Sequence, residues 1–519
     1  MTGDLLIGID AGTSVIKAVA FDLTGHEIAI ASRRNHYVTL PNGGVEQDMR
    51  RTWDDTVAVL RDLGEKVEDL PRRALALSVT GQGDGCWLID GAGEPVHDGW
   101  LWLDGRAVVE AREIADSDGM ELIYRTTGAG VNVCQMRTHL TWIRRHQPEL
   151  LERAETALHC KDWLYFRLTG LRVADPTEGV FTFGDFRSRQ YSEEVLQALG
   201  LSDLRRLLPP IVDGAVHADA LTDEAAAATG LPQGLPVTLA YVDVMCCAMA
   251  AGLHDARVQP GLTLLGSTGM HMRFAPDADA VVLNDQRCGY TMGFPGRAYA
   301  QMQTNMAATL NIDWVLGLAR EILASEGVER SLEDLLGGLD ERVMAAEPGA
   351  ALYHPYISAA GERGPFVEPN ARASFTGLQQ STGWFGLIRA VYEGLALAAR
   401  DCYAAMGPMP GEIRLSGGAA RSAGLRRILA AALGRPVRTV AQEEAGAAGA
   451  VMIAAVQQGL YPDIDTCTEA WVTPLLQPEE PPDPQLTGIY DALYEVYLST
   501  RQAMVPAWAG LVDARRTLS

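Results

Sequence analysis

The stretch from Leu5 to Asp22 constrains the fold of this chain more strongly than any other. Apolar residues run from Leu5 to Ile9, break at Asp10-Ala11-Gly12-Thr13, and return between Val15 and Phe21. This pattern predicts a strand, a tight turn and a second strand, because each apolar run has the length of a strand. The chain is therefore expected to open with a β-hairpin whose turn carries polar side chains.

The side chains of this turn are of the kinds that bind phosphate. Glycine lets backbone N–H groups approach a phosphate, and Thr13, Ser14 and Lys17 can donate hydrogen bonds to its oxygens. Asp10 can hold a hydrated Mg²⁺ ion. The alternative is an ordinary hairpin with a solvated turn, since the motif is short. No G-x-x-x-x-G-K-[ST] loop follows the strand, so a Walker-type site is not expected.

Length and charge limit the classes of protein to which the chain can belong. With 519 residues it is too long for one hydrophobic core, so two domains of roughly 200–250 residues are expected. A net charge of −23 repels nucleic acid and anionic membranes, so neither is an expected partner. The eight cysteines show no C-x-x-C spacing, which favours reduced thiols in the cytoplasm over disulfides or a zinc site.

No segment of the chain predicts export or a membrane span. The opening MTGD lacks a basic region followed by a long apolar stretch, so no signal peptide is expected. The apolar segment from Val237 to Leu253 is short and carries Asp243 at its centre, whereas a spanning helix needs ~20 apolar residues. This segment is therefore expected in the protein core.

Two motifs in the first half carry side chains suited to a polyol. A predicted strand ends at Thr80-Gly-Gln-Gly-Asp-Gly85, where three glycines expose Gln82 and Asp84. Further on, Trp102 is followed closely by Asp104, and proteins commonly hold polyols between aromatic faces and carboxylates. The alternatives are a polar turn at the first motif and core tryptophans with a surface ion pair at the second.

A carboxylate at the end of another predicted strand is the candidate catalytic base. The strand Val237–Val242 delivers Asp243, and an apolar helix is expected over Val244–Leu253. A lone carboxylate in such surroundings is costly unless it faces a ligand or a partner. Asp243 is therefore expected to accept a proton from an attacking hydroxyl.

Two glycine-containing turns in the second half supply further candidate nucleotide contacts. Gly266-Ser267-Thr268-Gly269 follows an apolar run and has the shape of the first turn. Later, Gly417, Gly418 and Arg421 lie between a predicted strand and a predicted helix, a place where a flat ring and ribose can lie against backbone.

Four other segments receive structural predictions. They are a charged helix face at Lys161-Asp162, a loop with short strands over 175–192, an amphipathic helix over 384–400, and a linker at 474–484 before a last helix at 485–505.

Taken in order, these motifs resemble the FGGY family of carbohydrate kinases over nearly the whole chain. The resemblance is carried by G-I-D-x-G-T-S, W-L-D-G-R, K-D-W-L with R-L-T-G, P-x-G-L-P-V before Asp243, G-S-T-G, G-E-R-x-P and S-G-G-A-A-R-S. It implies an α/β fold with two ribonuclease-H-like domains of the actin-like ATPase superfamily flanking a central cleft. It also implies a sugar-binding catalytic domain over 1–250, an ATP-binding domain over 251–470, and a linker with a C-terminal helix over 471–519.

The resemblance also implies a role for each candidate residue. Asp243 matches the catalytic base, and Asp10 the acidic residue near Mg²⁺. The ATP and phosphate contacts fall on Thr13, Ser14, Lys17, Gly266, Ser267, Thr268, Gly417, Gly418 and Arg421, and the substrate contacts on Gln82, Asp84, Trp102, Asp104 and Asp243.

Within the family, T-G-Q-G-D-G, G-W-L-W-L-D and C-K-D-W-L look most like the members that phosphorylate erythritol. The expected reaction is transfer of phosphate from ATP, with Mg²⁺, to a terminal hydroxyl of this four-carbon polyol. A pentulose or pentitol substrate is the alternative, although the Q-M-H-G of pentulose kinases is here Gln82-Gly83-Asp84-Gly85. His139 and Gly386 also depart from the family pattern. A non-catalytic actin-like ATP-dependent sensor and a homodimer remain open.

Overall fold

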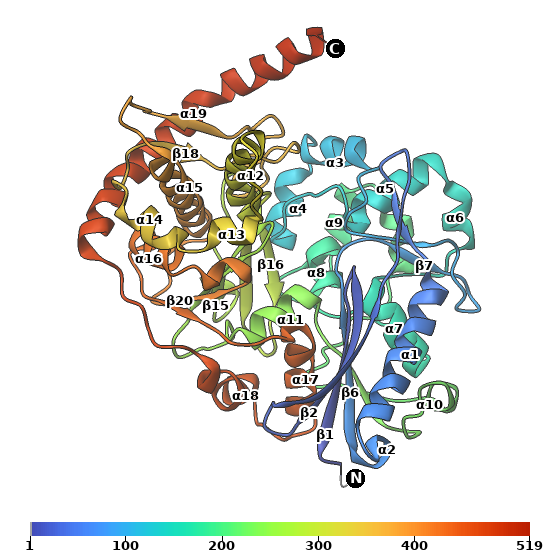
Figure 1. The fold of residues 1–519 in the computed structure, drawn as a ribbon. Coiled ribbons are helices and arrows are strands. Elements are labelled where there is room, and N and C mark those ends of the chain that lie inside the picture. The colour runs from blue at the N-terminus through green and yellow to red at the C-terminus, as the bar shows by residue number, and fades with distance from the viewer. Residues whose placement is uncertain (1–2, 519) are drawn as a thin grey trace.

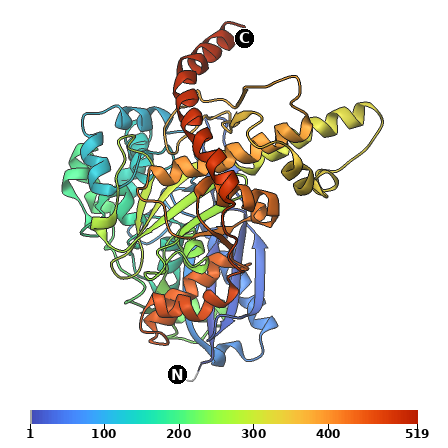
Figure 2. The same ribbon diagram turned by 90° about the vertical axis from the view of Figure 1, so that its left-hand side faces the viewer.

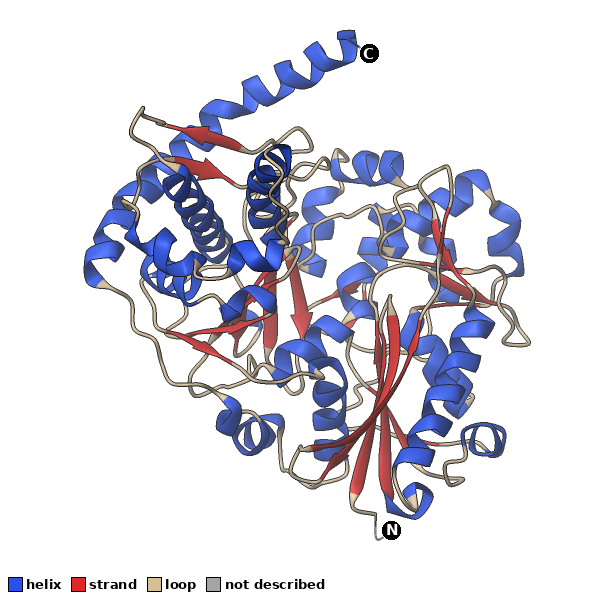
Figure 3. Ribbon diagram, in the orientation of Figure 1, coloured by secondary structure: helices blue, strands red, loops and turns tan. Residues whose placement is uncertain are grey.

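The protein consists of two α/β halves that lie side by side (Figures 1 and 3). The structure is a computed structural model and describes residues 3–518. Each half is built on a six-stranded sheet.

The first sheet has the strand order β12-β13-β6-β1-β2-β3. Strands β1 and β2 form the expected hairpin, with Asp10 opposite Lys17. Because β1 runs parallel to β6, their ends meet at one edge and Asp10 lies beside Thr80. The strands are β1 (Leu5–Ala11), β2 (Val15–Asp22), β3 (Glu27–Arg34), β6 (Ala74–Gly81), β12 (Asp219–Ala220) and β13 (Pro236–Leu239).

Helices α1 and α7 pack beside this sheet, and the chain between β6 and β13 adds a layer of helices and short strands. The helices are α1 (Met49–Lys66), α2 (Leu70–Arg73), α3 (Val108–Ala115), α4 (Met120–Thr127), α5 (Met136–His146), α6 (Pro148–Arg153), α7 (Cys160–Thr169), α8 (Glu178–Phe183), α9 (Glu193–Ala198) and α10 (Asp223–Thr229). The short strands of this half are β4 (Val38–Thr39) and β5 (Val45–Gln47), which precede β6, and β7 (Trp87–Ile89), β8 (Gly99–Trp100), β9 (Thr156–Leu158), β10 (Gly184–Asp185) and β11 (Gln190–Tyr191), which follow it.

The second sheet has the strand order β16-β17-β15-β14-β20-β21, and again contains a hairpin, β14–β15. Its strands are β14 (Gly261–Leu265), β15 (Gly269–Ala275), β16 (Tyr290–Gly293), β17 (Tyr299–Asn305), β20 (Ile413–Ser416) and β21 (Val437–Thr439), beside the pair β18 (Leu352–His354) and β19 (Ser374–Thr376). Its helices are α12 (Thr309–Ser325), α13 (Leu332–Leu336), α14 (Leu339–Ala345), α15 (Trp384–Ala404), α16 (Ala423–Leu433) and α19 (Pro484–Leu518).

Two helices between the sheets join the halves into one core. Helix α11 (Asp243–Ala250) packs against α17 (Ala445–Gln457), which in turn packs on β1 and β6 of the first sheet, while α18 (Ile464–Trp471) follows it. The contact between α11 and α17 is close because Gly449 has no side chain: a Cβ there would lie 1.9 Å from the carbonyl oxygen of Cys246. A single buried cluster therefore includes side chains of both sheets and of both helices.

Three sequence-based expectations need correction or extension. Lys161 and Asp162 are fully buried rather than on an exposed helix face. The expected loop over 175–192 contains helix α8. The last helix runs on to Leu518, and its buried side chains, among them Tyr490 and Tyr497, pack into the core of the second half. None of the helices in the described part of the chain has the length and apolarity needed to cross a membrane.

The close contact at Gly449 predicts a large effect of one added methyl group. We expect Gly449→Ala to lower the midpoint of thermal unfolding, because overpacking a core typically costs about 1–3 kcal/mol. The matched control is Gly317→Ala in α12, where a Cβ meets no atom within 4 Å. This control should leave the midpoint unchanged or raise it, since alanine is favoured over glycine in a helix by up to about 1 kcal/mol. Equal shifts in the two variants would contradict the packing described here.

Candidate active site

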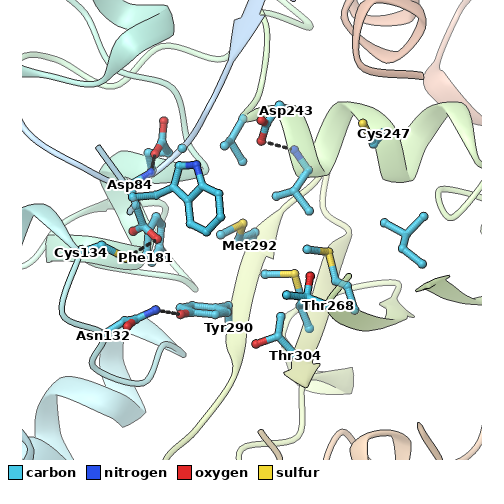
Figure 4. Close-up of a pocket in the computed structure, with 18 of the residues that line it drawn as sticks. Asp84, Asn132, Cys134, Phe181, Asp243, Cys247, Thr268, Tyr290, Met292 and Thr304 are labelled. Atoms are coloured by element: carbon cyan, nitrogen blue, oxygen red, sulfur yellow. Dashed lines mark hydrogen bonds between the residues drawn. The ribbon is translucent and has the colours of Figure 1, made fainter. Parts of the chain in front are cut away.

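A cavity of about 390 Å³ lies between the two halves. Figure 4 shows that its walls come from both: Asp84, Cys134 and Asp243 from the first, and Thr268, Tyr290, Met292 and Thr304 from the second. Thr13, Trp102, Glu178, Phe181 and Arg363 also line it. Its size fits a small molecule.

Asp243 faces this cavity from the first residue of α11, immediately after the segment that follows β13. One of its carboxylate oxygens, Oδ1, accepts a hydrogen bond from the N–H of Val244 at 2.6 Å. Burial raises the pKa of Asp243 to about 8, and the negative charge of Asp10 contributes to the rise. A carboxylate with a raised pKa at a cavity wall is suited to accepting a proton.

Asp10 lies at the end of β1 close to Asp243. Burial raises its pKa to about 6, while the charge of Lys17 acts in the opposite direction. Lys17 Nζ forms an ion pair with Glu444 Oε2 at 2.7 Å, so the expected phosphate-binding lysine has a partner just before α17. Helix α17 also faces Asp10 directly, because a Cβ on Gly446 would lie 2.3 Å from Asp10 Oδ2.

The first turn is connected to the tryptophan that covers the cavity. Thr13 Oγ1 donates to Gln82 Oε1 at 3.0 Å and accepts from Trp102 Nε1 at 2.8 Å. Gln82 in turn donates to Gln47 Oε1 at 2.9 Å and is buried. Ser14 is exposed at the edge of the turn. Thr13 and Trp102 therefore line the cavity, whereas Gln82 supports Thr13 from behind.

Asp84 reaches the cavity through an unusual backbone conformation. Its φ of 55° lies in the left-handed region, and its N–H donates to Glu178 Oε1 at 2.6 Å. Its Oδ2 accepts from the thiol of Cys134 at 3.5 Å, but its buried Oδ1 has no hydrogen-bond partner in the described structure. Burial raises the pKa of Asp84. An unpartnered buried carboxylate oxygen at a cavity wall is a candidate ligand contact.

Asp104, expected to contact the substrate, is placed elsewhere. It is fully buried, and its carboxylate accepts from the N–H of Val45 at 2.8 Å and pairs with Arg106 Nη2 at 2.8 Å. Because these protein donors occupy its oxygens and it does not line the cavity, we revise the role of Asp104 from contact to support. The same revision applies to Gln82.

The turns of the second half lie next to each other. Gly266, Ser267 and Thr268 form the exposed turn between β14 and β15, and Thr268 also lines the cavity. Gly417 has a φ of 91°, and a Cβ there would lie 2.7 Å from the carbonyl oxygen of Leu265. Gly418 and Arg421 are exposed beside it. The two turns thus form one accessible surface at the edge of the cleft.

A buried charge cluster lies behind the cavity and was not predicted. Lys161 Nζ contacts Asp162 Oδ1 at 2.8 Å, Asp175 Oδ1 at 2.7 Å and Glu178 Oε2 at 3.0 Å, and all four side chains are fully buried. The K-D-W-L motif marked the lysine, but nothing in the spacing identified its partners from the following segment.

This cluster is linked to both candidate carboxylates. Asp175 accepts from the hydroxyl of Thr177, and Thr177 Oγ1 accepts from the N–H of Val242 at 3.2 Å, one residue before Asp243. Glu178 accepts from the N–H of Asp84, as described above. Lys161 therefore holds the backbone at both carboxylates through intermediate residues.

Comparisons with known proteins agree with this architecture. Residues 5–250 match the model of the N-terminal domain of the FGGY family of carbohydrate kinases, and residues 262–458 match that of its C-terminal domain. The erythritol kinase of Brucella abortus is 50% identical over 514 residues, which cover 99% of each chain. The xylulose kinase of Escherichia coli is 28% identical over 97% of this chain and all of its own.

Solved structures show the same fold. The crystal structure of xylulose kinase from Rhodospirillum rubrum, 29% identical, superposes with a TM-score of 0.85 over 97% of this chain and 100% of that one. The two-domain α/β fold of the actin-like ATPases that the motifs implied is therefore confirmed. The chain is a phosphotransferase and belongs to the FGGY family of carbohydrate kinases.

Proposed function

We propose that this protein transfers the terminal phosphate of ATP to a terminal hydroxyl of erythritol. The observation that carries the proposal is the 50% identity, spanning 99% of both chains, to a protein named erythritol kinase. The xylulose kinases of Escherichia coli and Rhodospirillum rubrum are only 28% and 29% identical to this chain. A cavity with carboxylates at two places on its wall is consistent with a small substrate rich in hydroxyl groups.

In this proposal each candidate residue has a defined task. Asp243 orients the attacking hydroxyl and accepts its proton, while Asp84 and Trp102 hold the rest of the polyol. The phosphates contact Thr13, Ser14, Lys17, Gly266, Ser267 and Thr268, and the adenosine lies against Gly417, Gly418 and Arg421. Gln82 and Asp104 keep Thr13 and the Trp102 segment in place.

Asp10 is the residue proposed to hold Mg²⁺. Burial and the negative charge of Glu444 raise the pKa of Asp10, and burial and the charge of Asp10 raise that of Asp243, so a cation held by Asp10 would offset an unfavourable accumulation of negative charge. The described residues contain no cluster of three or more metal-ligating side chains. A single carboxylate suits Mg²⁺, which is commonly held by one or two carboxylates together with substrate phosphates. When bound, the ion neutralises developing charge on the phosphates.

The protein's own contribution is positioning and proton acceptance. Asp243, held by the Val242–Thr177 hydrogen bond, takes the proton from the terminal CH₂OH as the hydroxyl oxygen attacks the γ-phosphorus. The bond between the γ-phosphorus and the β,γ-bridging oxygen breaks, and ADP leaves. Trp102 and the apolar side chains Phe181 and Met292 line the same cavity and exclude water from the attacking position.

Asp243→Asn tests the role of the base. We expect kcat to fall about 10²–10⁴-fold, because the variant keeps the shape of the side chain but cannot accept the proton. The matched control is Asp223→Asn, which changes the exposed first residue of α10 and should leave kcat unchanged. Steady-state kinetics with MgATP and erythritol provide the measurement. A kcat near the wild-type value would remove Asp243 from this role.

The same variant has a stability signature that separates loss of chemistry from loss of fold. The pKa of Asp243 is raised from 3.8 to about 8, so the folded protein keeps a proton that the unfolded chain releases. Wild-type stability should therefore fall as pH rises through this window. Asparagine does not ionise, so it does not lose stability in this way. Asp243→Asn should therefore unfold at a higher temperature than wild type at pH 8–9 and at a similar temperature near pH 4.

The raised pKa also predicts the pH dependence of the reaction. Since only ionised Asp243 accepts a proton, kcat/KM should rise with pH up to about 8, approaching tenfold per pH unit below that value. The residual kcat/KM of Asp243→Asn should not show this rise with pH. A profile that is flat from pH 5 to 8 in wild type would show that another group is the base.

A substrate panel tests the proposed function itself. We expect erythritol to give a kcat/KM higher by orders of magnitude than glycerol, threitol, xylitol, ribitol, xylulose or ribulose in an assay of ADP release. Polar sites strongly reject substrates that leave a buried polar group unpaired. If a ketopentose gave the highest kcat/KM, the assignment to the family would stand but erythritol would be the wrong substrate. ATP turnover that no polyol stimulates would favour the actin-like sensor.

A further inference from the structure

One side chain of the cavity, Arg363, brings a positive charge from the second half toward the carboxylates of the first. It lies in the loop between β18 and β19 and lines the cavity. Its Nε donates to Thr304 Oγ1 at 3.1 Å. Its terminal Nη groups form no hydrogen bond or ion pair with any residue that the structure describes. A guanidinium carries five N–H donors, so most of its donors are free to bind a ligand.

The backbone around Arg363 is held rigidly. Glu362 Oε1 accepts from the N–H of Met306 and from that of Arg363, both at 2.9 Å. Asn305 Nδ2 donates to the carbonyl oxygen of Gly364 at 2.8 Å. A Cβ on Gly364 would lie 2.7 Å from the carbonyl oxygen of Thr304, so this loop packs directly on the end of β17. The guanidinium is therefore positioned before any ligand arrives, which lowers the entropic cost of binding.

Arg363 has hydrogen-bond donors without an acceptor, and Asp84 has an acceptor without a donor. Asp84 has a buried Oδ1 without a donor, and burial raises its pKa while the positive charge of Arg363 partly offsets this rise. A hydroxyl group satisfies both residues, because it donates to a carboxylate and accepts from a guanidinium. A ligand carboxylate would satisfy Arg363 but meet Asp84, Glu178 and Asp243, and an apolar group would satisfy neither.

We propose that Arg363 is a substrate-binding residue that, together with Asp84, holds a hydroxyl of the acyclic polyol remote from the one that is phosphorylated. This inference rests on the proposed function. It makes the polyol a bridge between the two halves, since Asp84 belongs to the first and Arg363 to the second. It also predicts that the cavity favours a neutral polyol over an acid of the same length, because the acid would meet the carboxylates of Asp84, Glu178 and Asp243.

The test pairs variants of Arg363 with substrates that lack one hydroxyl. Arg363→Met and Arg363→Lys are compared with wild type on erythritol, butane-1,2,3-triol and butane-1,2,4-triol, each with saturating MgATP. Arg297→Met is the control, because Arg297 is an exposed arginine of the same half that does not line the cavity. Thermal unfolding of each variant shows whether it is folded.

We expect Arg363→Met to lower kcat/KM for erythritol about 10- to 100-fold, the range for a hydrogen bond to a charged group. For the triol that lacks the contacted hydroxyl, wild type should already be impaired and the substitution should add little further loss. Arg363→Lys should be intermediate, because it keeps the charge without the forked geometry. Arg297→Met should match wild type on every substrate.

Two results would overturn the inference: the same fold-loss in Arg363→Met on erythritol and on both triols, or no loss on erythritol. If Arg363→Met does not fold, Arg363→Lys is compared with wild type on the same three substrates. The same fold-loss on all three, or no loss on erythritol, would again overturn the inference. Should wild type prefer another polyol or a ketopentose, the proposed function fails, and the variants are compared on that substrate and its deoxy analogues. The two failures are thus separated.

Discussion

The active-site geometry depends on one buried ammonium group, that of Lys161. Its three carboxylate partners, Asp162, Asp175 and Glu178, are as buried as the lysine itself. Taking so many charges out of water costs several kcal/mol per ion, and removing one partner from such a group is strongly destabilising. The cluster therefore contributes more to the placement of these segments than to net stability, because Lys161, Asp175 and Glu178 keep their partners only while the two segments stay together.

Two hydrogen-bonded connections link this cluster to the cavity. Through Asp175 and Thr177 it reaches the backbone just before Asp243, and through Glu178 it reaches the backbone of Asp84. Asp84 occupies a left-handed conformation that is uncommon for a residue with a side chain, and the hydrogen bond from its N–H to Glu178 helps to hold it there. The two carboxylates thus share a single support, although they come from segments far apart in the sequence.

The sequence predicted the elements whose signals are local. Both hairpins, the strand before Asp243 and the glycine turn at Gly417 follow from apolar runs and breakers within a few residues. The partners of Lys161 could not be predicted in this way, because Asp175 and Glu178 approach it from a segment that shows no periodicity. The role of Asp104 had to be revised for a related reason. Its pairing with Arg106 and with the N–H of Val45 depends on tertiary packing, which cannot be predicted from composition. Family resemblance supplied the two-domain fold, which periodicity alone did not.

The position of α17 has a consequence for how the chain is made. This helix covers β1, and Gly8 of that strand touches Ala447 of the helix, so residues from opposite ends of the chain complete one core. During synthesis the first sheet emerges from the ribosome long before its cover exists (Figure 2 shows the blue strands beside orange helices). An apolar sheet face without its cover is prone to aggregate. We therefore expect the first half to complete its core only after α17 has been translated, so that a chain truncated before this helix leaves one face of the first sheet uncovered.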